Sequence, residues 1–291
     1  MNMDVQTTPT PTIPHAEFFP PPRTPRGPSR WLALIAEDHQ NLVRFWPVVQ
    51  NMVVQDLRVR YQRSMLGFFW TLLNPLLMMA VMSVVFAKLF PQIDRFTVYL
   101  FAGMVPWTFL AASLNDSAFC IIQNEGLIRK IYLPKLIFPL TRMLINLITF
   151  VLSMGALFLF LAPLGARFSL PMLLLPVVVL LFSAFVLGLG LIVATTNTFY
   201  RDCSHLVAVF LQAWYFATPI IYMTSLFKED MRWRFWLNPA FPFIRLFQAV
   251  IYDGQWPALN TLLVATVLAT ASLGIGYAAF KCHEDKLVFR L

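Results

Sequence analysis

Six long stretches of the sequence contain no Asp, Glu, Lys or Arg, and this feature limits the possible folds more than any other. They are Ser64–Ala87, Phe96–Asn115, Met143–Ala166, Phe168–Tyr200, Cys203–Phe227 and Gly254–Phe280. Each has at least 20 residues, roughly the number that an α-helix needs to cross the hydrocarbon core of a bilayer. A soluble core accommodates one such stretch, but not six in succession. Only 12% of the 291 residues are charged, about half the share typical of soluble domains.

The stretches predict an all-α integral membrane protein with six transmembrane helices. We place the spans at about 65–89, 96–119, 137–163, 169–197, 203–224 and 257–280, in a single membrane domain of residues 31–291. Small residues at Gly188–Gly190 and Ala271–Gly276 predict close helix packing, because side chains of this size let helix backbones approach each other. The three cysteines have no metal-binding or disulfide spacing.

The basic residues predict the orientation. With six spans, 15 of the 22 Lys and Arg residues fall on the side that holds both termini. Basic loops face the cytoplasm, so we expect a multi-pass protein of a bacterial inner membrane with both termini cytoplasmic. The net charge of +8 then reflects cytoplasmic loops rather than nucleic-acid binding. Residues 1–30 hold eight of the 21 prolines and no apolar core of a signal peptide, and we predict a disordered cytoplasmic tail.

Three segments outside the spans carry amphipathic or aromatic patterns. Apolar residues recur every three or four positions at about 41–63, with arginines opposite. This pattern predicts a helix along the inner leaflet, with Pro47 as a kink or in its first turn. This helix could serve either as a simple membrane anchor or as a docking surface for a cytoplasmic partner. Gly126 and Pro134 bracket one or two amphipathic turns in the loop 123–135. In the aromatic segment 225–256 we expect two short re-entrant helices on the periplasmic side, broken at Asn238-Pro239 and at Pro242.

The sequence lacks the motifs of a self-contained pump or enzyme. It has no G-x-x-x-x-G-K-[ST] phosphate loop, no H-E-x-x-H metal motif and no acidic pair at the outer face. We therefore predict that the chain is not an enzyme, holds no cofactor or metal, and takes energy for any transport from another polypeptide.

Several motifs resemble those of ABC-2-type exporter permeases, in particular the group that exports O-antigen, teichoic acid and capsule. The run Arg58–Met79 (RVRYQRSMLGFFWTLLNPLLMM) resembles the start of that family's first span. Further similar segments follow in the family's order: Phe101–Trp107, Asn115–Pro134, Phe199–Asp202, Thr218–Ile220 and Asn238-Pro239. The resemblance covers about residues 40–291.

The resemblance implies a complex of two permease copies with two ATP-binding subunits that carry the ATP and Mg²⁺. It makes 41–63 an interface helix and 125–133 a short cytoplasmic coupling helix. The substrate would be an undecaprenyl-diphosphate-linked polysaccharide that enters from the inner leaflet. By this analogy, residues that contact the ATPase are Glu125, Leu127, Ile128, Arg129, Lys130 and Tyr132. Residues near the lipid pyrophosphate or headgroups are Arg58, Arg60 and Arg63. Residues that line the glycan channel are Phe69, Trp70, Trp107, Trp214, Tyr215 and Tyr222.

Within this resemblance we favour O-antigen as the exported polymer, with teichoic acid and capsule as alternatives. A drug or lipid ABC-2 exporter is a further possibility, which the LGFFWTLLNP stretch (residues 66–75) and the preceding arginines disfavour. A membrane-embedded glycosyltransferase is disfavoured by the missing acidic pair, and a structural scaffold would not need a coupling helix.

Overall fold

A computed structural model describes residues 28–61, 95–161, 169–287 and 290, together with positions 73, 77–78, 80–82 and 84–86. Residues 1–27 and most of the predicted first span, 65–89, lie outside this part. The described chain is helical and contains no strand. Its α-helices are α1 Pro28–Arg44, α2 Trp46–Tyr61, α4 Phe96–Phe119, α5 Glu125–Ile128, α6 Ile137–Leu161, α7 Leu175–Phe199, α8 Cys203–Ala217, α9 Glu229–Arg232, α10 Phe241–Gln248 and α11 Leu259–Leu287. Shorter helical turns are η1 Ile122–Asn124, η3 Leu170–Leu174, η4 Thr224–Leu226, η5 Trp233–Leu237 and the π-helical turn η6 Ala249–Asp253.

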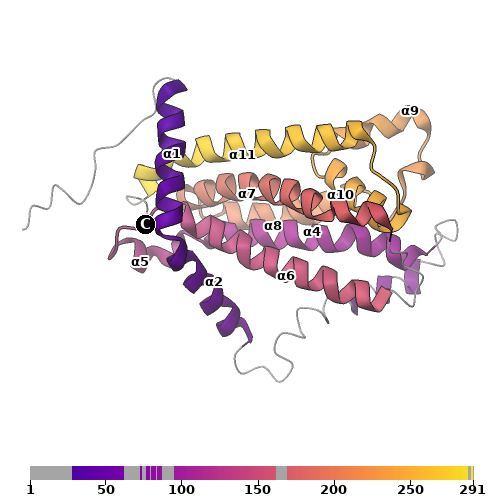
Figure 1. Cartoon of the computed structure of the whole chain (residues 1–291), viewed down its shortest axis with the longest axis horizontal. Helices are drawn as coiled ribbons and strands as arrows, with labels where there is room; N and C mark the ends of the chain where they lie inside the picture. The colour runs from indigo at the N-terminus through magenta and orange to yellow at the C-terminus, as the bar shows by residue number, and fades with distance from the viewer. Residues whose placement is uncertain are drawn as a thin grey trace, which may run out of the picture.

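Within the described residues, four helices are long and apolar enough to cross a membrane: α4, α6, α7 continued by η3, and α11. They run along the long axis of the molecule (Figure 1). At 1.5 Å per residue, the 24 residues of α4 extend about 36 Å, more than the ~30 Å of a hydrocarbon core. The described part of the chain is therefore that of an all-α, multi-pass membrane protein.

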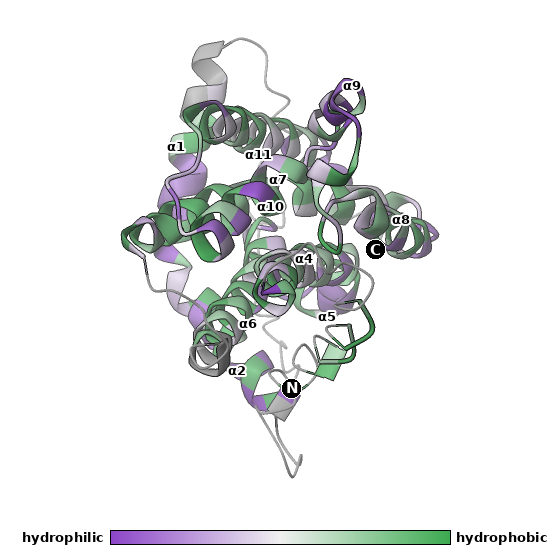
Figure 2. Cartoon of the chain, turned by 90° about the vertical axis from the view of Figure 1, so that its right-hand side faces the viewer, coloured by the Kyte–Doolittle hydropathy of each residue, from purple (hydrophilic) through white to green (hydrophobic). Residues whose placement is uncertain are grey.

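Helix α4 lies at the centre of the bundle. In its most apolar window 78% of the residues are buried, whereas the figure for α11 is 17%. Figure 2, viewed along the bundle, shows α6, α7, α8 and α10 around α4, with α11 beyond α7. The chain thus builds its core around the second predicted span and leaves the apolar side of α11 facing outward.

Helix α7 ends two residues beyond the predicted 197, and two other predicted spans end further from the expected residues. Helix α8 ends at Ala217 rather than at 224, because Thr218 is extended (φ −100°, ψ 132°) and a residue that precedes proline avoids the helical conformation. Its 15 residues extend about 22 Å, less than the ~30 Å core. Helix α11 continues to Leu287 rather than ending at 280. Its charged last turns are paired, since the Lys281 amine lies 2.6 Å from the Glu284 carboxylate.

The N-terminal part forms two helices instead of the one predicted at 41–63. Phe45 lies in a turn between α1 and α2, and Pro47 falls in the first turn of α2, where its missing N–H leaves no helical hydrogen bond unmade. Helix α1 begins at Pro28, so the last three residues of the predicted tail 1–30 are helical. Figure 1 shows α1 lying across one end of the bundle. That end, which also carries α2, α5 and the C-terminal turns of α11, is called the α5 end below, and the opposite end is called the α9 end.

Helices α7 and α11 approach each other at glycines. A Cβ atom built on Gly188 would lie 2.3 Å from the Ser272 carbonyl carbon. One built on Gly276 would lie 2.1 Å from the Gly188 carbonyl oxygen. The two backbones are therefore in direct contact, as the small residues of these segments predict.

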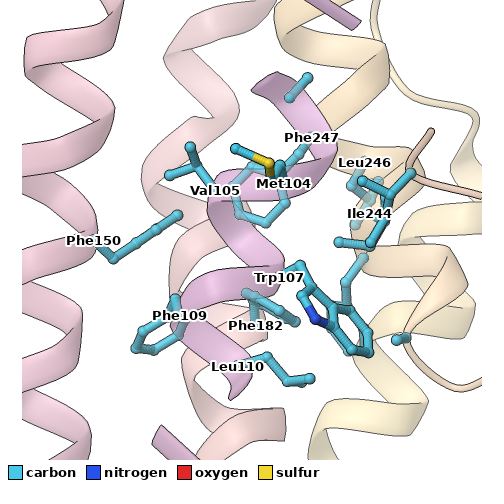
Figure 3. Close-up of a cluster of buried hydrophobic side chains, with 14 of the residues drawn as sticks. Met104, Val105, Trp107, Phe109, Leu110, Phe150, Phe182, Ile244, Leu246 and Phe247 are labelled. Atoms are coloured by element: carbon cyan, nitrogen blue, oxygen red, sulfur yellow. The ribbon is translucent and has the colours of Figure 1, made fainter. Parts of the chain in front are cut away.

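Helix α10 is buried within the bundle, packed against α4, α7 and α11. All of its residues except Arg245 are buried. Figure 3 shows its Phe247 beside Met104 and Val105 of α4. The Phe247 ring centroid lies 5.9 Å from that of Phe150 in α6 and 5.7 Å from that of Phe182 in α7. Pro242 lies in the first turn of α10, so the predicted break there is absent, whereas η5 does end before Asn238-Pro239.

Candidate functional site

The loop 122–135 places an apolar side inward and a charged side outward at the α5 end. Leu127 and Ile128 are partly buried against a cluster that contains Val49 and Val53 of α2. Ile131 and Tyr132 are each 54% exposed. More than half of each of these two large side chains is exposed, so the loop presents apolar surface beside its charged residues.

The helical part of this loop is shorter than the predicted 125–133. α5 ends at Ile128, and Leu133 precedes Pro134, which disfavours a helical conformation. The Arg129 guanidinium lies 2.7 Å from the Glu125 carboxylate, one helical turn away. Arg129 and Lys130 are exposed beside Ile131 and Tyr132. The predicted coupling residues therefore lie together on one short surface loop.

A chain of polar contacts joins α2 to α4 and α6. The Arg142 guanidinium of α6 lies 2.8 Å from the Asp56 carboxylate of α2. Arg60 of α2 lies 3.6 Å from both Asp56 and Asp116, the latter at the end of α4. The Asn146 amide donates to Asp116 at 2.9 Å. The side chains of Arg142 and Asp56 are only 19% and 29% exposed, so this pair is less hydrated than the Arg60–Asp116 pair, whose side chains are 37% and 34% exposed.

Of the three arginines predicted to lie near the lipid phosphates, two are described. Arg58 is exposed on α2, and Arg60 lies in the ion-pair chain with Asp56 and Asp116. Arg63 lies outside the described residues. Arg60 thus contacts two carboxylates, a structural role that the sequence does not indicate.

A second polar cluster, absent from the sequence predictions, ties α1 to α11. Asp38 of α1 accepts hydrogen bonds from the Tyr277 hydroxyl at 2.6 Å and from the Lys281 amine at 2.7 Å. Lys135 lies at the end of the loop 122–135, called the α5 loop below, and donates to the Glu284 carbonyl at 2.9 Å. Burial lowers the pKa of Lys135, while the charge of Glu284 acts in the opposite direction. These contacts join α1, the α5 loop and the C-terminal turns of α11 into one unit.

Three of the predicted channel aromatics meet where α8 packs on α4. The Trp107 ring centroid lies 5.5 Å from that of Trp214 and 5.7 Å from that of Tyr215. Trp107 itself is 5% exposed, so it supports the other two rings from behind. The Trp214 indole donates to the Asn238 side chain at 2.7 Å, and the Asn238 amide donates to the Thr218 hydroxyl at 2.9 Å.

The remaining channel predictions fall elsewhere. Tyr222 packs in a separate aromatic group at the α9 end, 5.5 Å from Phe227 between ring centroids. Phe69 and Trp70 lie outside the described residues. Apolar side chains of α8 point away from the bundle: Leu206, Val209, Phe210 and Phe216 are between 59% and 69% exposed. Helix α8 therefore presents an apolar outer face next to the Trp214 and Tyr215 rings.

Comparisons with known proteins identify similar membrane transport proteins. A family model described as ABC-2 type transporter matches residues 47–252. The O-antigen export system permease protein RfbA of Myxococcus xanthus is 31% identical over 250 residues, covering 85% of this chain and 95% of that protein. The protein of the same name from Klebsiella pneumoniae is 29% identical over 254 residues, covering 86% and 95%. The polysialic acid transport protein KpsM of Escherichia coli is 23% identical over 251 residues, covering 82% and 95%.

Proposed function

Because the chain belongs to the ABC-2 type transporter family, we propose that it is the permease of an exporter that moves a lipid-linked polysaccharide, O-antigen, across the inner membrane. The observation that carries this proposal is the similarity to O-antigen export permeases over 95% of their length at 29–31% identity. The lower identity to the polysialic acid transport protein, 23%, makes a capsule-type polymer the second candidate. A drug or lipid exporter and a glycosyltransferase receive no such support.

In this proposal the energy comes from a separate ATPase subunit, the usual partner of an ABC-2 permease. Two copies of the chain, each with six spans and both termini in the cytoplasm, assemble with two ATPase subunits. The α5 end then faces the cytoplasm and the α9 end faces the periplasm. The four candidate spans and α8 supply five helices of each copy, and the predicted first span supplies the sixth.

The α5 loop is the proposed receiver of the ATPase movement. The exposed Ile131 and Tyr132, with the neighbouring basic residues, form the contact surface. Leu127 and Ile128 pass displacement of the loop to α2 through their shared apolar cluster. The Arg142–Asp56 pair then ties α2 to α6, so that α2 and the bundle move together.

The substrate path follows from the remaining predicted residues. Arg58, Arg60 and Arg63 would lie near the lipid pyrophosphate, since guanidinium groups bind phosphate oxygens in bidentate geometry. Trp214 and Tyr215 would stack on sugar rings, with Trp107 behind them and with Phe69, Trp70 and Tyr222 further along the path. The exposed apolar face of α8 would contact lipid or the second copy.

Deleting the gene in its host tests the proposal. We expect undecaprenyl-linked glycan to accumulate inside the cell and surface glycan to disappear, and the wild-type gene to restore export. An unchanged surface polymer would refute the proposal. Accumulation of a free lipid or drug without glycan would favour the other ABC-2 exporters, and loss of glycan synthesis itself would favour a glycosyltransferase.

A further inference from the structure

A small cavity lies at the α9 end, and none of its lining residues belongs to the substrate path proposed above. Its volume is about 170 Å³, and it lies where α4, η4, α10 and η6 meet. The polar lining residues are Tyr99, Thr224, Ser225, Arg245, Gln248 and Asp253, with Phe241 as the aromatic wall. None of the sequence motifs points to this cavity, because its residues come from segments more than 120 positions apart.

An ion pair supplies donors and acceptors to the cavity. The Arg245 guanidinium lies 2.8 Å from the Asp253 carboxylate, and their side chains are 42% and 26% exposed. A guanidinium has five N–H donors and a carboxylate about four acceptor positions. Their mutual contact cannot use them all, so the pair can bind further groups while its net charge stays zero.

The inner wall of the cavity is fixed by hydrogen bonds. The Tyr99 hydroxyl donates to the Tyr222 carbonyl at 2.8 Å, and the Gln248 amide donates to the Pro219 carbonyl at 3.0 Å. The Tyr99 ring also packs edge-on against Tyr252, with ring centroids 5.2 Å apart. The cavity is therefore formed before any ligand arrives, as binding sites for small molecules usually are.

Size and polarity together select the class of ligand. A protein cavity of about 150 Å³ holds a benzene ring, so this cavity suits one six-membered ring. An apolar ring in the cavity would displace water from the free donor and acceptor positions of this partly exposed pair without replacing its hydrogen bonds, which is costly. A simple anion gains little from a pair of zero net charge. A pyranose fits both requirements, because its hydroxyl groups donate and accept while its C–H face packs on an aromatic ring.

We propose that this cavity is a subsite that binds one pyranose ring of a glycan chain at the outer end of the permease. The inference rests on the proposed function, since the chain must meet sugars for the site to be used. In this subsite the Arg245–Asp253 pair holds one ring of the outgoing polymer.

The test measures protection of position 225 in the purified full-length chain with its ATPase subunit. Ser225→Cys is labelled with a maleimide, and modification at that position is followed by mass spectrometry. Galactose, mannose and N-acetylglucosamine are the cyclic probes. Acyclic sorbitol and inorganic phosphate are the comparison solutes. Leu237→Cys, which replaces a residue 72% exposed at the same end, controls for effects on the reagent.

We expect at least one cyclic sugar to slow labelling at position 225 and neither sorbitol nor phosphate to do so. Adding the double change Arg245→Gln with Asp253→Asn should weaken binding of the protecting sugar about tenfold. A tenfold change in affinity corresponds to about 1.4 kcal/mol. The matched control is Arg232→Gln with Glu229→Gln, which removes a similar pair outside the cavity, 3.6 Å apart in α9, and should leave protection unchanged.

If the cavity double variant does not fold, Thr224→Trp fills the cavity from the η4 turn and should abolish protection in the same way. The inference is overturned if no sugar protects, if phosphate protects as well as sugar, or if the folded cavity variants are protected like the wild type. The assay uses neither ATP nor transport. Failure here alongside lost export in the gene deletion rejects the subsite alone, whereas unchanged surface glycan in the deletion rejects the proposed function.

Discussion

The contact between α7 and α11 makes a quantitative prediction about two glycines of one helix. The Cβ of Gly276→Ala would lie 2.1 Å from the Gly188 carbonyl oxygen, whereas a Cβ at Gly274 meets nothing within 4 Å. Real Cβ atoms essentially never come within 3.0 Å of a heavy atom outside their own residue and its chain neighbours. The neighbour at Gly276 is backbone, so the helices themselves must separate.

Overpacking of this kind costs about 1–3 kcal/mol. Replacing Gly by Ala within a helix otherwise stabilises it by about 1 kcal/mol. Gly274→Ala therefore measures the intrinsic effect of the substitution, and Gly276→Ala measures that effect plus the clash. We expect the two variants to differ by roughly 2 kcal/mol, with Gly276→Ala the less stable.

Thermal unfolding of the purified variants in one detergent and at one scan rate measures this difference. One kcal/mol shifts the midpoint by about 2–4 °C in a protein of 150–250 residues, so the apparent midpoints should differ by several degrees. Equal midpoints for Gly276→Ala and Gly274→Ala would show that the two helices are not in backbone contact.

Three further predictions concern the proposed function. Ile131→Asp should abolish co-purification of the ATPase subunit, because it places a charge in an apolar contact, while Leu237→Asp at the α9 end should not; equal recovery of the ATPase would contradict the docking surface. In a double-mutant cycle, Arg142→Gln and Asp56→Asn should be coupled by about 0.5–3 kcal/mol in thermal stability, since each single change leaves a mostly buried charge without this partner; additive effects would show that the ion pair does not link α2 to α6. Trp214→Phe should lower export and cost about 1 kcal/mol of stability, because it removes the hydrogen bond to the Asn238 side chain; unchanged glycan export in cells would argue against this wall of the path.

The bounds of several described helices follow from local composition. Helix α4 matches the predicted 96–119 at both ends, since its uncharged stretch follows Arg95 directly. The uncharged stretch does not indicate the end of α8, because it continues past Ala217, where the extended Thr218 before Pro219 stops the helix. Helix α11 outlasts its uncharged stretch because Lys281 finds partners, one of which is 243 positions away in the sequence.

The candidate site was only partly predictable for the same reason. The resemblance and the residue type point to Trp107, Trp214 and Tyr215 separately, but only the fold brings the three rings together. The Asp38–Lys281 contact and the role of Arg60 between two carboxylates need three-dimensional proximity that periodicity does not contain. The cavity at the α9 end depends on α10 folding back into the bundle. The aromatic composition of 225–256 indicates a return toward the membrane, but it does not indicate how deeply α10 lies.

The most direct test of the central claim is transport by purified components. The chain is reconstituted into vesicles with and without its ATPase subunit, and movement of undecaprenyl-linked glycan into the lumen is measured with and without ATP. We predict transport only when the chain, the ATPase subunit and ATP are all present. ATP hydrolysis or glycan transport by the chain alone would contradict the claim that this polypeptide forms the path while another supplies the energy.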